Sequence, residues 1–188
     1  AVTPYYYSTY EGGNAHEGID LTPQCKKDGT ERIVVVGSGP IRIGQGIEFD
    51  YGCVHAVGAI RDMGHEAIII NNNPETVSTD FDTSDRLYFD PLTPESVMEI
   101  LLRERADGIL LQFGGQTAIN LALPIEAQLS HLENMGVSMQ MVGTSPDAVD
   151  EASDRYRFEE FAKKNNLRMP RGTCLLYTSP SPRDDVIS

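Results

Sequence analysis

The 188-residue sequence has few cysteines, few basic residues and no long apolar run. Its three cysteines, Cys25, Cys53 and Cys174, share no CxxC spacing and leave an odd count. That pattern favours a reducing cytoplasm over a disulfide framework or a zinc site. The longest uncharged apolar runs, such as Ile33–Val36 and Ala67–Ile70, are too short to span a bilayer. No cationic start precedes an apolar core, so no signal peptide is expected. We therefore expect a cytoplasmic protein that does not associate with a membrane.

The charge balance is strongly acidic. Lysine and arginine total 15 against 28 aspartates and glutamates, which gives a net charge of -13. This excess of negative charge argues against nonspecific binding to nucleic acid or to an anionic membrane. Hydrophobic residues make up 40% of the chain, enough for one α/β domain of ordinary size with flanking segments.

The pattern of the chain changes near Arg32. Residues 11–31 are polar, contain glycine and lack periodicity, so they are interpreted as a linker between residues 1–10 and a domain. After Arg32, apolar runs alternate with amphipathic segments. Strands are expected at Ile33–Val36, Ala67–Ile70, Arg86–Phe89, Gly108–Gln112 and Met139–Val142. Helices are expected at Glu48–Met63, Pro94–Arg105, Ala118–Leu132 (with an ambiguity at Pro124) and Asp147–Asn165.

This alternation predicts an α/β fold, a Rossmann-like open parallel sheet with helices on both faces. Continuous apolar runs are typical of parallel strands buried on both sides. The first helix has one apolar face, and Gly64 is a plausible stop for it. That face comprises Phe49, Cys53, Val57 and Ile60. Ligands of such sheets bind at the carboxyl ends of the strands.

The first loop at that edge, GSGPIRIGQG, fits neither common phosphate motif. Arg42 stands where the dinucleotide fingerprint needs its third glycine. Gly39 and Gly44 have the spacing of a Walker A loop, but no lysine follows. The loop is either a tight turn without a ligand or an anion site at a helix start that Arg42 would reinforce.

Two further loops leave the same edge. In NNNPETVSTDFDTSDR, Glu75 could act as an acid–base or hydrogen-bonding group, or it could be a solvated acid near a helix N-cap. In FGGQT, the two glycines could line a cleft or simply end a strand. No histidine has a partner at metal-ligand spacing, so no metal site is expected.

Four strings in order carry a family resemblance: IRIGQGIEFDYGCVHAVGAIRDMG, NNNPETVSTDFDTSDRLYFDPLTPESVMEI, LLQFGGQTAINLA and VGTSPDAVDEASDRYRF. Together they resemble the large subunit of the carbamoyl-phosphate synthetase family over about residues 5–172. The loops GQGIEFDYG and NPETVSTD are similar to the second, carbamate-phosphorylating half rather than the first, which usually reads GQACEFDYSG and NPATIMTD.

The resemblance implies a division of the chain. Residues 1–10 would end the preceding oligomerisation region, and residues 32–153 would form the pre-ATP-grasp domain. Residues 154–172 would begin the helical lead into the ATP-grasp domain. Residues 173–188, which include CLLYTSPSPRDDVIS, depart from the family and are interpreted as a non-native or disordered tail.

The resemblance also implies a function. The chain would be a fragment of an ATP-dependent ligase of arginine and pyrimidine biosynthesis, which makes carbamoyl phosphate from bicarbonate, glutamine-derived ammonia and two ATP. Gly46, Glu48 and Glu75 would line the tunnel for unstable intermediates, with Arg42, Asn73 and Gln116 as weaker candidates.

No catalytic residue is expected in this chain under that reading. ATP and Mg²⁺ or Mn²⁺ would bind the missing ATP-grasp domain, and no cofactor is expected on the fragment, which alone would be inactive. The implied partners are the glutaminase small subunit and the rest of the large subunit.

Two alternatives stay open at this point. A nicotinamide-dependent oxidoreductase is disfavoured by Arg42 and by the lack of a ribose-binding acid at Asn71–Asn73. A free-standing module that binds an anion or a partner is compatible with the fold. The presence of a downstream ATP-grasp domain would separate it from the ligase.

Overall fold

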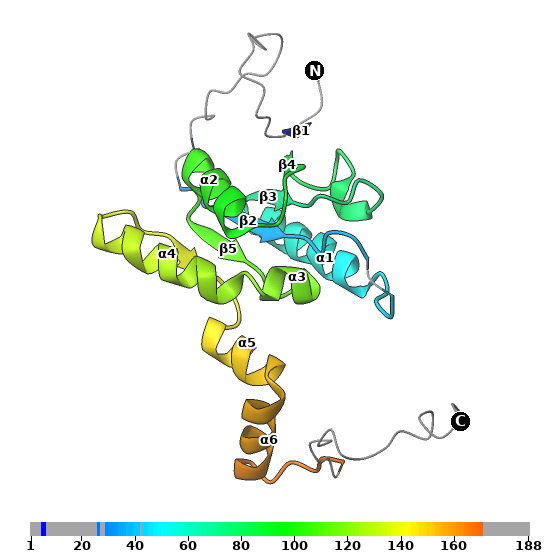
Figure 1. Cartoon of the computed structure of the whole chain (residues 1–188). Coiled ribbons are helices and arrows are strands. Elements are labelled where there is room, and N and C mark those ends of the chain that lie inside the picture. Colours follow the sequence, from blue (N-terminus) through cyan, green and yellow to red (C-terminus); the bar gives the residue numbers. More distant parts are fainter. Residues whose placement is uncertain (1–4, 7–25, 27–28, 42, 171–188) are drawn as a thin grey trace, which may run out of the picture. The chain divides into compact units, whose positions relative to one another are not determined.

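The computed structural model describes residues 5–6, 26, 29–41 and 43–170 (Figure 1). Most of the predicted linker, the predicted tail 173–188, Arg42, Cys25 and Cys174 lie outside the described residues. The strands are β1 Tyr5–Tyr6, β2 Arg32–Val36, β3 Glu66–Ile70, β4 Arg86–Tyr88, β5 Gly108–Leu110 and β6 Gln140–Met141. The helices are α1 Glu48–Asp62, the 3-10 helix η1 Val77–Thr79, α2 Pro94–Glu104, α3 Gly115–Ile119, α4 Ala122–Asn134, α5 Pro146–Ser153 and α6 Arg155–Lys164. The chain divides into two compact units, Ala1–Asp150 and Glu151–Ser188.

All six strands form one parallel sheet in the order β1-β4-β3-β2-β5-β6. The first strand of the alternating part, β2, lies at the centre, and its five residues are all buried. Strands β3 and β4 extend the sheet on one side of β2, and β5 and β6 extend it on the other. Strands β2 to β6 follow the doubly wound Rossmann order, so the predicted fold class is confirmed. The edge strand β1, which pairs with β4, was not predicted from the sequence.

Helices cover both faces of the sheet because side chains alternate along each strand. Ile33 and Val35 pack in a cluster with Cys53 and Val57 of α1. Val34 lies in the opposite cluster, which α2 and α4 complete (Figure 1). Fully burying one such aliphatic side chain contributes about 1.5–3 kcal/mol, so the two clusters hold the sheet between its helices.

The predicted helices over Glu48–Met63 and Pro94–Arg105 are confirmed as α1 and α2. Helix α1 stops just before Gly64, whose φ of +83° suits glycine in the left-handed region. Helix α2 begins with Thr93 as its N-cap, whose side-chain oxygen accepts the backbone N–H of Ser96 at 3.3 Å. Pro94 follows at the first helical position, where the missing N–H costs nothing.

The predicted single helix over Ala118–Leu132 is wrong. Two helices, α3 and α4, replace it, and the break falls at Asn120 and Leu121. Pro124 explains the break, because in a continuous helix its ring would clash with the carbonyl four residues earlier, that of Asn120. In the first turn of α4 it is tolerated.

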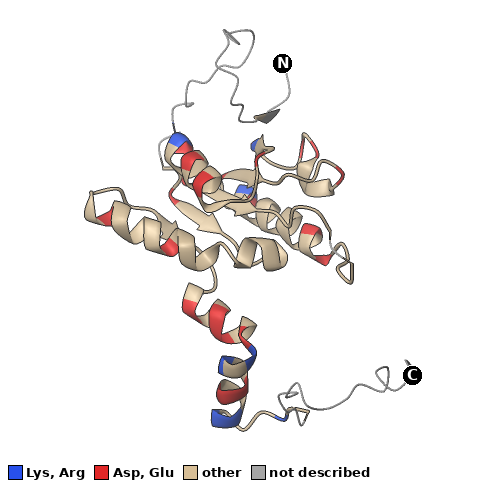
Figure 2. Cartoon of the chain, in the orientation of Figure 1, with Lys and Arg blue, Asp and Glu red and all other residues tan. Residues whose placement is uncertain are grey.

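The predicted helix over Asp147–Asn165 is likewise divided, into α5 and α6. Asp154 is extended and caps α6, its carboxylate accepting the Arg157 N–H at 2.8 Å. Helix α6 mixes acidic and basic residues along its length (Figure 2), and Lys163 pairs with Glu159 one turn away. No described helix is both long and apolar enough to cross a membrane.

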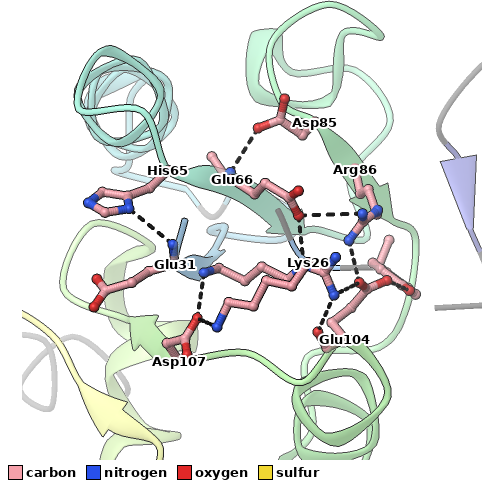
Figure 3. A network of polar contacts seen from close by, with 11 residues as sticks. Lys26, Glu31, His65, Glu66, Asp85, Arg86, Glu104 and Asp107 are labelled. Atoms are coloured by element: carbon pink, nitrogen blue, oxygen red, sulfur yellow. Dashed lines mark hydrogen bonds and ion pairs between the residues drawn. The ribbon is translucent and has the colours of Figure 1, made fainter. Parts of the chain in front are cut away.

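The amino ends of β2, β3 and β4 carry a buried network of charges (Figure 3). Arg32 donates from Nε to the Glu66 carboxylate at 2.6 Å and from Nη1 to the Glu104 carbonyl at 2.8 Å. Arg86 pairs with both Glu66 and Glu104, and the Tyr88 hydroxyl donates to Glu104. Two guanidinium groups therefore face two carboxylates.

Burial defines the character of this network. Arg32 is 1% exposed, and Arg86 and Glu104 are 5% exposed. Burial, with the hydrogen bond to Glu104 as the second cause, raises the pKa of Tyr88 far above its ordinary value. Charges removed from water must be paired, so we interpret this edge as structural.

Candidate functional site

The loops that follow β2, β3 and β5 leave the sheet at its carboxyl edge. The chain runs from β2 to β3 on one side, whereas β5 lies on the other side of β2. The edge between β2 and β5 is therefore the topological switch point, where open α/β sheets bind their ligands. All the site residues predicted from the sequence belong to these three loops or to the helix starts that follow them.

In the loop between β2 and α1, a backbone N–H is already bonded to a glutamate carboxylate. The N–H of Gly46 donates to Oε1 of Glu48 at 3.1 Å. Glu48 is the first residue of α1, where negative charge suits the helix dipole. A phosphate at this helix start would meet that carboxylate, so the geometry disfavours the nicotinamide-dependent alternative.

The loop between β3 and β4 is organised around Asn71, which is 0% exposed. Its Oδ1 accepts the N–H groups of Gly39 at 3.1 Å and Asn73 at 3.2 Å. Its Nδ2 donates to the hydroxyls of Thr76 and Ser78, each at 3.3 Å. One side chain thus links the loops that follow β2 and β3.

Asn73 continues this link towards Glu75. Its Nδ2 donates to the Gly39 carbonyl at 3.3 Å, and its Oδ1 accepts the N–H of Glu75 at 3.1 Å. Glu75 is exposed and directly precedes Thr76, the N-cap residue of η1. Its backbone is held while its side chain faces solvent.

Asp50 joins the same loop to α1. Its carboxylate accepts the N–H groups of Val77 at 2.9 Å and Ser78 at 3.2 Å. Asp50 lies two residues after Glu48 in the first turn of α1. The helix start that carries Glu48 is therefore tied to the loop that carries Glu75.

The loop after β5 packs tightly on the first loop. An added Cβ at Gly114 would meet the Val36 carbonyl, and it would lie 2.5 Å from the Cβ of Ala118 and 2.7 Å from the Gly37 carbonyl. Only glycine allows this approach. Gly115 has a φ of +63°, and a Cβ there would lie 3.1 Å from the ring of Phe49. The starts of α1 and α3 are thus neighbours.

The predicted site residues are placed as follows. Gly46 bonds Glu48, and Asn73 bonds Glu75, so two pairs are brought together. Gln116 is exposed on α3, and its amide donates to Asn120 at 2.7 Å. In the part of the chain that the structure describes, no hydrogen bond or ion pair joins Glu48 to Glu75. Arg42 lies outside that part.

No reactive thiol or metal cluster belongs to this edge among the described residues. Burial, reinforced by the negative charge of Asp50, raises the pKa of Cys53 to about 12, which makes this thiol inert. Within residues 5–6, 26, 29–41 and 43–170, no group of three or more His, Cys, Asp or Glu could hold a metal ion.

Residues 29–151 match the family described as "Carbamoyl phosphate synthase preATP-grasp domain". The chain belongs to this family. The carbamoyl phosphate synthase large chain of Methanothrix thermoacetophila is 53% identical over 171 residues, which are 91% of this chain and 15% of that protein. The large chain of Clostridium acetobutylicum is 51% identical over 175 residues, 93% of this chain and 15% of that protein.

A further relative is divided into sections. The "Carbamoyl phosphate synthase large chain, C-terminal section" of Methanocaldococcus jannaschii is 51% identical over 176 residues, 92% of this chain and 26% of that protein. The chain thus spans about 15% of the length of undivided large chains.

A solved structure supports the fold of this family member. The "Biotin Carboxylase domain of single-chain bacterial carboxylase" has a TM-score of 0.53 at 13% identity. The likeness covers 78% of this chain and 32% of that one. At this identity it shows the shared fold alone.

Two organising residues were missed by sequence reasoning. From the sequence, Asn71 was considered only as a position that lacks a ribose-binding acid, and Asp50 was assigned no role. Asp50 did carry a signal, because it lies three residues before Cys53 and so shares the buried face of α1. A polar residue on an apolar helix face has to find a buried partner.

Proposed function

We propose that this chain forms the pre-ATP-grasp domain of the second, carbamate-phosphorylating half of a carbamoyl phosphate synthase large chain. The observation that carries the proposal is the 51% identity to a protein named as the C-terminal section of that large chain. In the whole enzyme, this domain would flank the passage of intermediates towards the second phosphorylation site.

The carboxyl edge supplies the residues for this role. Gly46, Glu48 and Glu75 are exposed there on a backbone that hydrogen bonds hold in place. Exposed carboxylates on a fixed backbone offer hydrogen-bond acceptors to a small neutral intermediate, and glycine leaves room beside them. Asn73 and Gln116 would stand at the same edge as weaker contributors, together with Arg42.

The phosphorylation chemistry would be supplied elsewhere in the enzyme. ATP and Mg²⁺ or Mn²⁺ would bind the ATP-grasp domain, and a glutaminase small subunit would supply ammonia. The edge that carries Glu48 also exposes apolar side chains, namely Ile41 at 46%, Ile43 at 109%, Ile47 at 75% and Tyr51 at 63%. Exposed apolar side chains suit an interface, and we propose that the rest of the large chain covers them.

A graft tests the proposal. The matching 171 residues of the Methanothrix thermoacetophila large chain would be replaced by those of this chain. We expect the purified graft to form carbamoyl phosphate from bicarbonate, ammonia and ATP. A folded graft that forms none would contradict the proposal and favour the free-standing binding module.

The same graft tests the two carboxylates. Glu48→Gln and Glu75→Gln preserve shape and remove charge at the proposed passage. We expect each to raise the ATP consumed per carbamoyl phosphate formed, because misplaced intermediates decompose before the second phosphorylation. Glu99→Gln on the exposed face of α2 is the matched control and should leave this ratio unchanged.

A further inference from the structure

Asn71 is the point at which the two loops of the proposed passage are joined. Its side chain has two acceptor sites on Oδ1 and two donor hydrogens on Nδ2. All four are used, towards Gly39, Asn73, Thr76 and Ser78. Since the residue is 0% exposed, water cannot replace a lost partner.

The surrounding backbone is shaped to admit this amide. A Cβ at Gly37 would lie 2.7 Å from both Cγ and Nδ2 of Asn71, so only glycine leaves the space. The N–H of Gly37 donates to Ile70 at 2.8 Å, and the N–H of Asn71 donates to Tyr88 at 3.0 Å. The Asn71 side-chain amide is therefore held in a fixed place at the ends of β2, β3 and β4.

The bonds of Asn71 lead to both proposed carboxylates. Through Asn73 they reach the backbone N–H of Glu75. Through Ser78, whose N–H is held by Asp50, they reach the first turn of α1, which carries Glu48. Asn71 itself is buried, and its side-chain hydrogen bonds within the described residues go to neither carboxylate group.

We propose that Asn71 is a positioning residue that aligns Glu48 and Glu75 along the passage. The proposal rests on the proposed function, because it assigns Asn71 a role in that passage. Only an amide fits the four partners without adding charge: leucine has a similar volume but no polar atoms, and aspartate is isosteric but has no donor. Small displacements of positioned groups have large effects on turnover.

The test uses the grafted large chain and measures ATP consumed per carbamoyl phosphate formed. Loss of active molecules lowers both quantities together, so a purely structural role would not move this ratio. With Asn71→Leu we expect the ratio to rise about threefold or more, because the loop loses several hydrogen bonds and leaves its aligned position.

Asn71→Asp and Leu129→Ala serve as an intermediate variant and a stability control. Asn71→Asp keeps both acceptors, and the hydroxyls of Thr76 and Ser78 can turn to donate to it, so its ratio should lie between those of the parent graft and Asn71→Leu. Leu129→Ala removes a buried side chain of α4 in the opposite cluster. It should destabilise the domain and leave the ratio at the parent value.

The failures are distinguishable. An active parent graft whose ratio is unchanged by Asn71→Leu overturns the role of Asn71 and leaves the proposed function standing. A folded parent graft that makes no carbamoyl phosphate contradicts the proposed function. If Asn71→Leu does not fold, Asn73→Ala removes the next link to Glu75, and an unchanged ratio there overturns the positioning role.

Discussion

The two edges of the sheet use charged residues in opposite ways. At the amino edge, Arg32, Arg86 and Glu104 are buried and satisfy one another (Figure 3). At the carboxyl edge, buried Asn71 and Asp50 bond backbone groups, and the carboxylates of Glu48 and Glu75 stay exposed. A charge that is paired inside the fold serves stability, whereas an exposed charge on a fixed backbone is available to a ligand.

The largest effect on stability should come from the amino edge. Glu104→Gln keeps the volume of the side chain but leaves the two buried guanidinium groups of Arg32 and Arg86 facing the single carboxylate of Glu66. We expect the free energy of unfolding, measured by urea denaturation, to fall by about 3–5 kcal/mol, as when one partner of a buried pair is removed. Glu99→Gln on the exposed face of the same helix should change it by less than about 0.5 kcal/mol. If Glu104→Gln and Glu99→Gln lowered the free energy of unfolding equally, the buried network at the amino edge would not be a special source of stability.

A smaller effect should come from close packing at the carboxyl edge. Gly114→Ala places a Cβ against two carbonyl oxygens and the side chain of Ala118. We expect a loss of about 1–3 kcal/mol in the free energy of unfolding, the usual cost of overpacking. Gly58→Ala in α1 meets nothing within 4 Å and should instead stabilise the chain by about 0.4–1 kcal/mol. If Gly114→Ala left the free energy of unfolding unchanged, the loops at the carboxyl edge would not be closely packed.

The smallest effect should be a pH dependence at Asp107. Burial alone would raise its pKa, but hydrogen bonds from Lys26 and the Arg32 N–H, with the charges of both, hold the pKa below the ordinary 3.8. The contribution of Asp107 to stability is therefore present above that value and lost as pH falls through the lowered one. Asp107→Asn should lose less stability between pH 7 and pH 3 in urea titrations. An identical loss of stability in the parent and in Asp107→Asn would show that the Asp107 carboxylate makes no such contribution.

Much of the fold could be predicted because both faces of this sheet are covered. Ile33–Val36 and Ala67–Ile70 stand out as continuous apolar runs for that reason. The interruptions of the helices could not be placed by periodicity, since Pro124 and Asp154 leave the apolar spacing around them intact. The two-residue strand at Tyr5–Tyr6 is too short for any periodicity.

The place of the candidate residues in the fold could be predicted from the sequence, whereas the hydrogen bonds around them could not. Parallel strands place their following loops at one edge, which brought Gly46, Glu48 and Glu75 to the same side of the sheet. The roles of Asn71 and Asp50 depend on partners that lie 32 and 28 residues away in the chain. Such long-range pairs are set by the register of β2 and β3, which a single sequence does not reveal.

The contrast between the edges is tested most directly by one measurement on the grafted large chain, the ATP consumed per carbamoyl phosphate formed. Glu75→Gln should raise this ratio while the free energy of unfolding stays near that of the parent. Glu104→Gln should lower stability and leave the ratio of the remaining folded enzyme unchanged. A ratio that rises with Glu104→Gln and not with Glu75→Gln would contradict the assignment of the carboxyl edge to the passage.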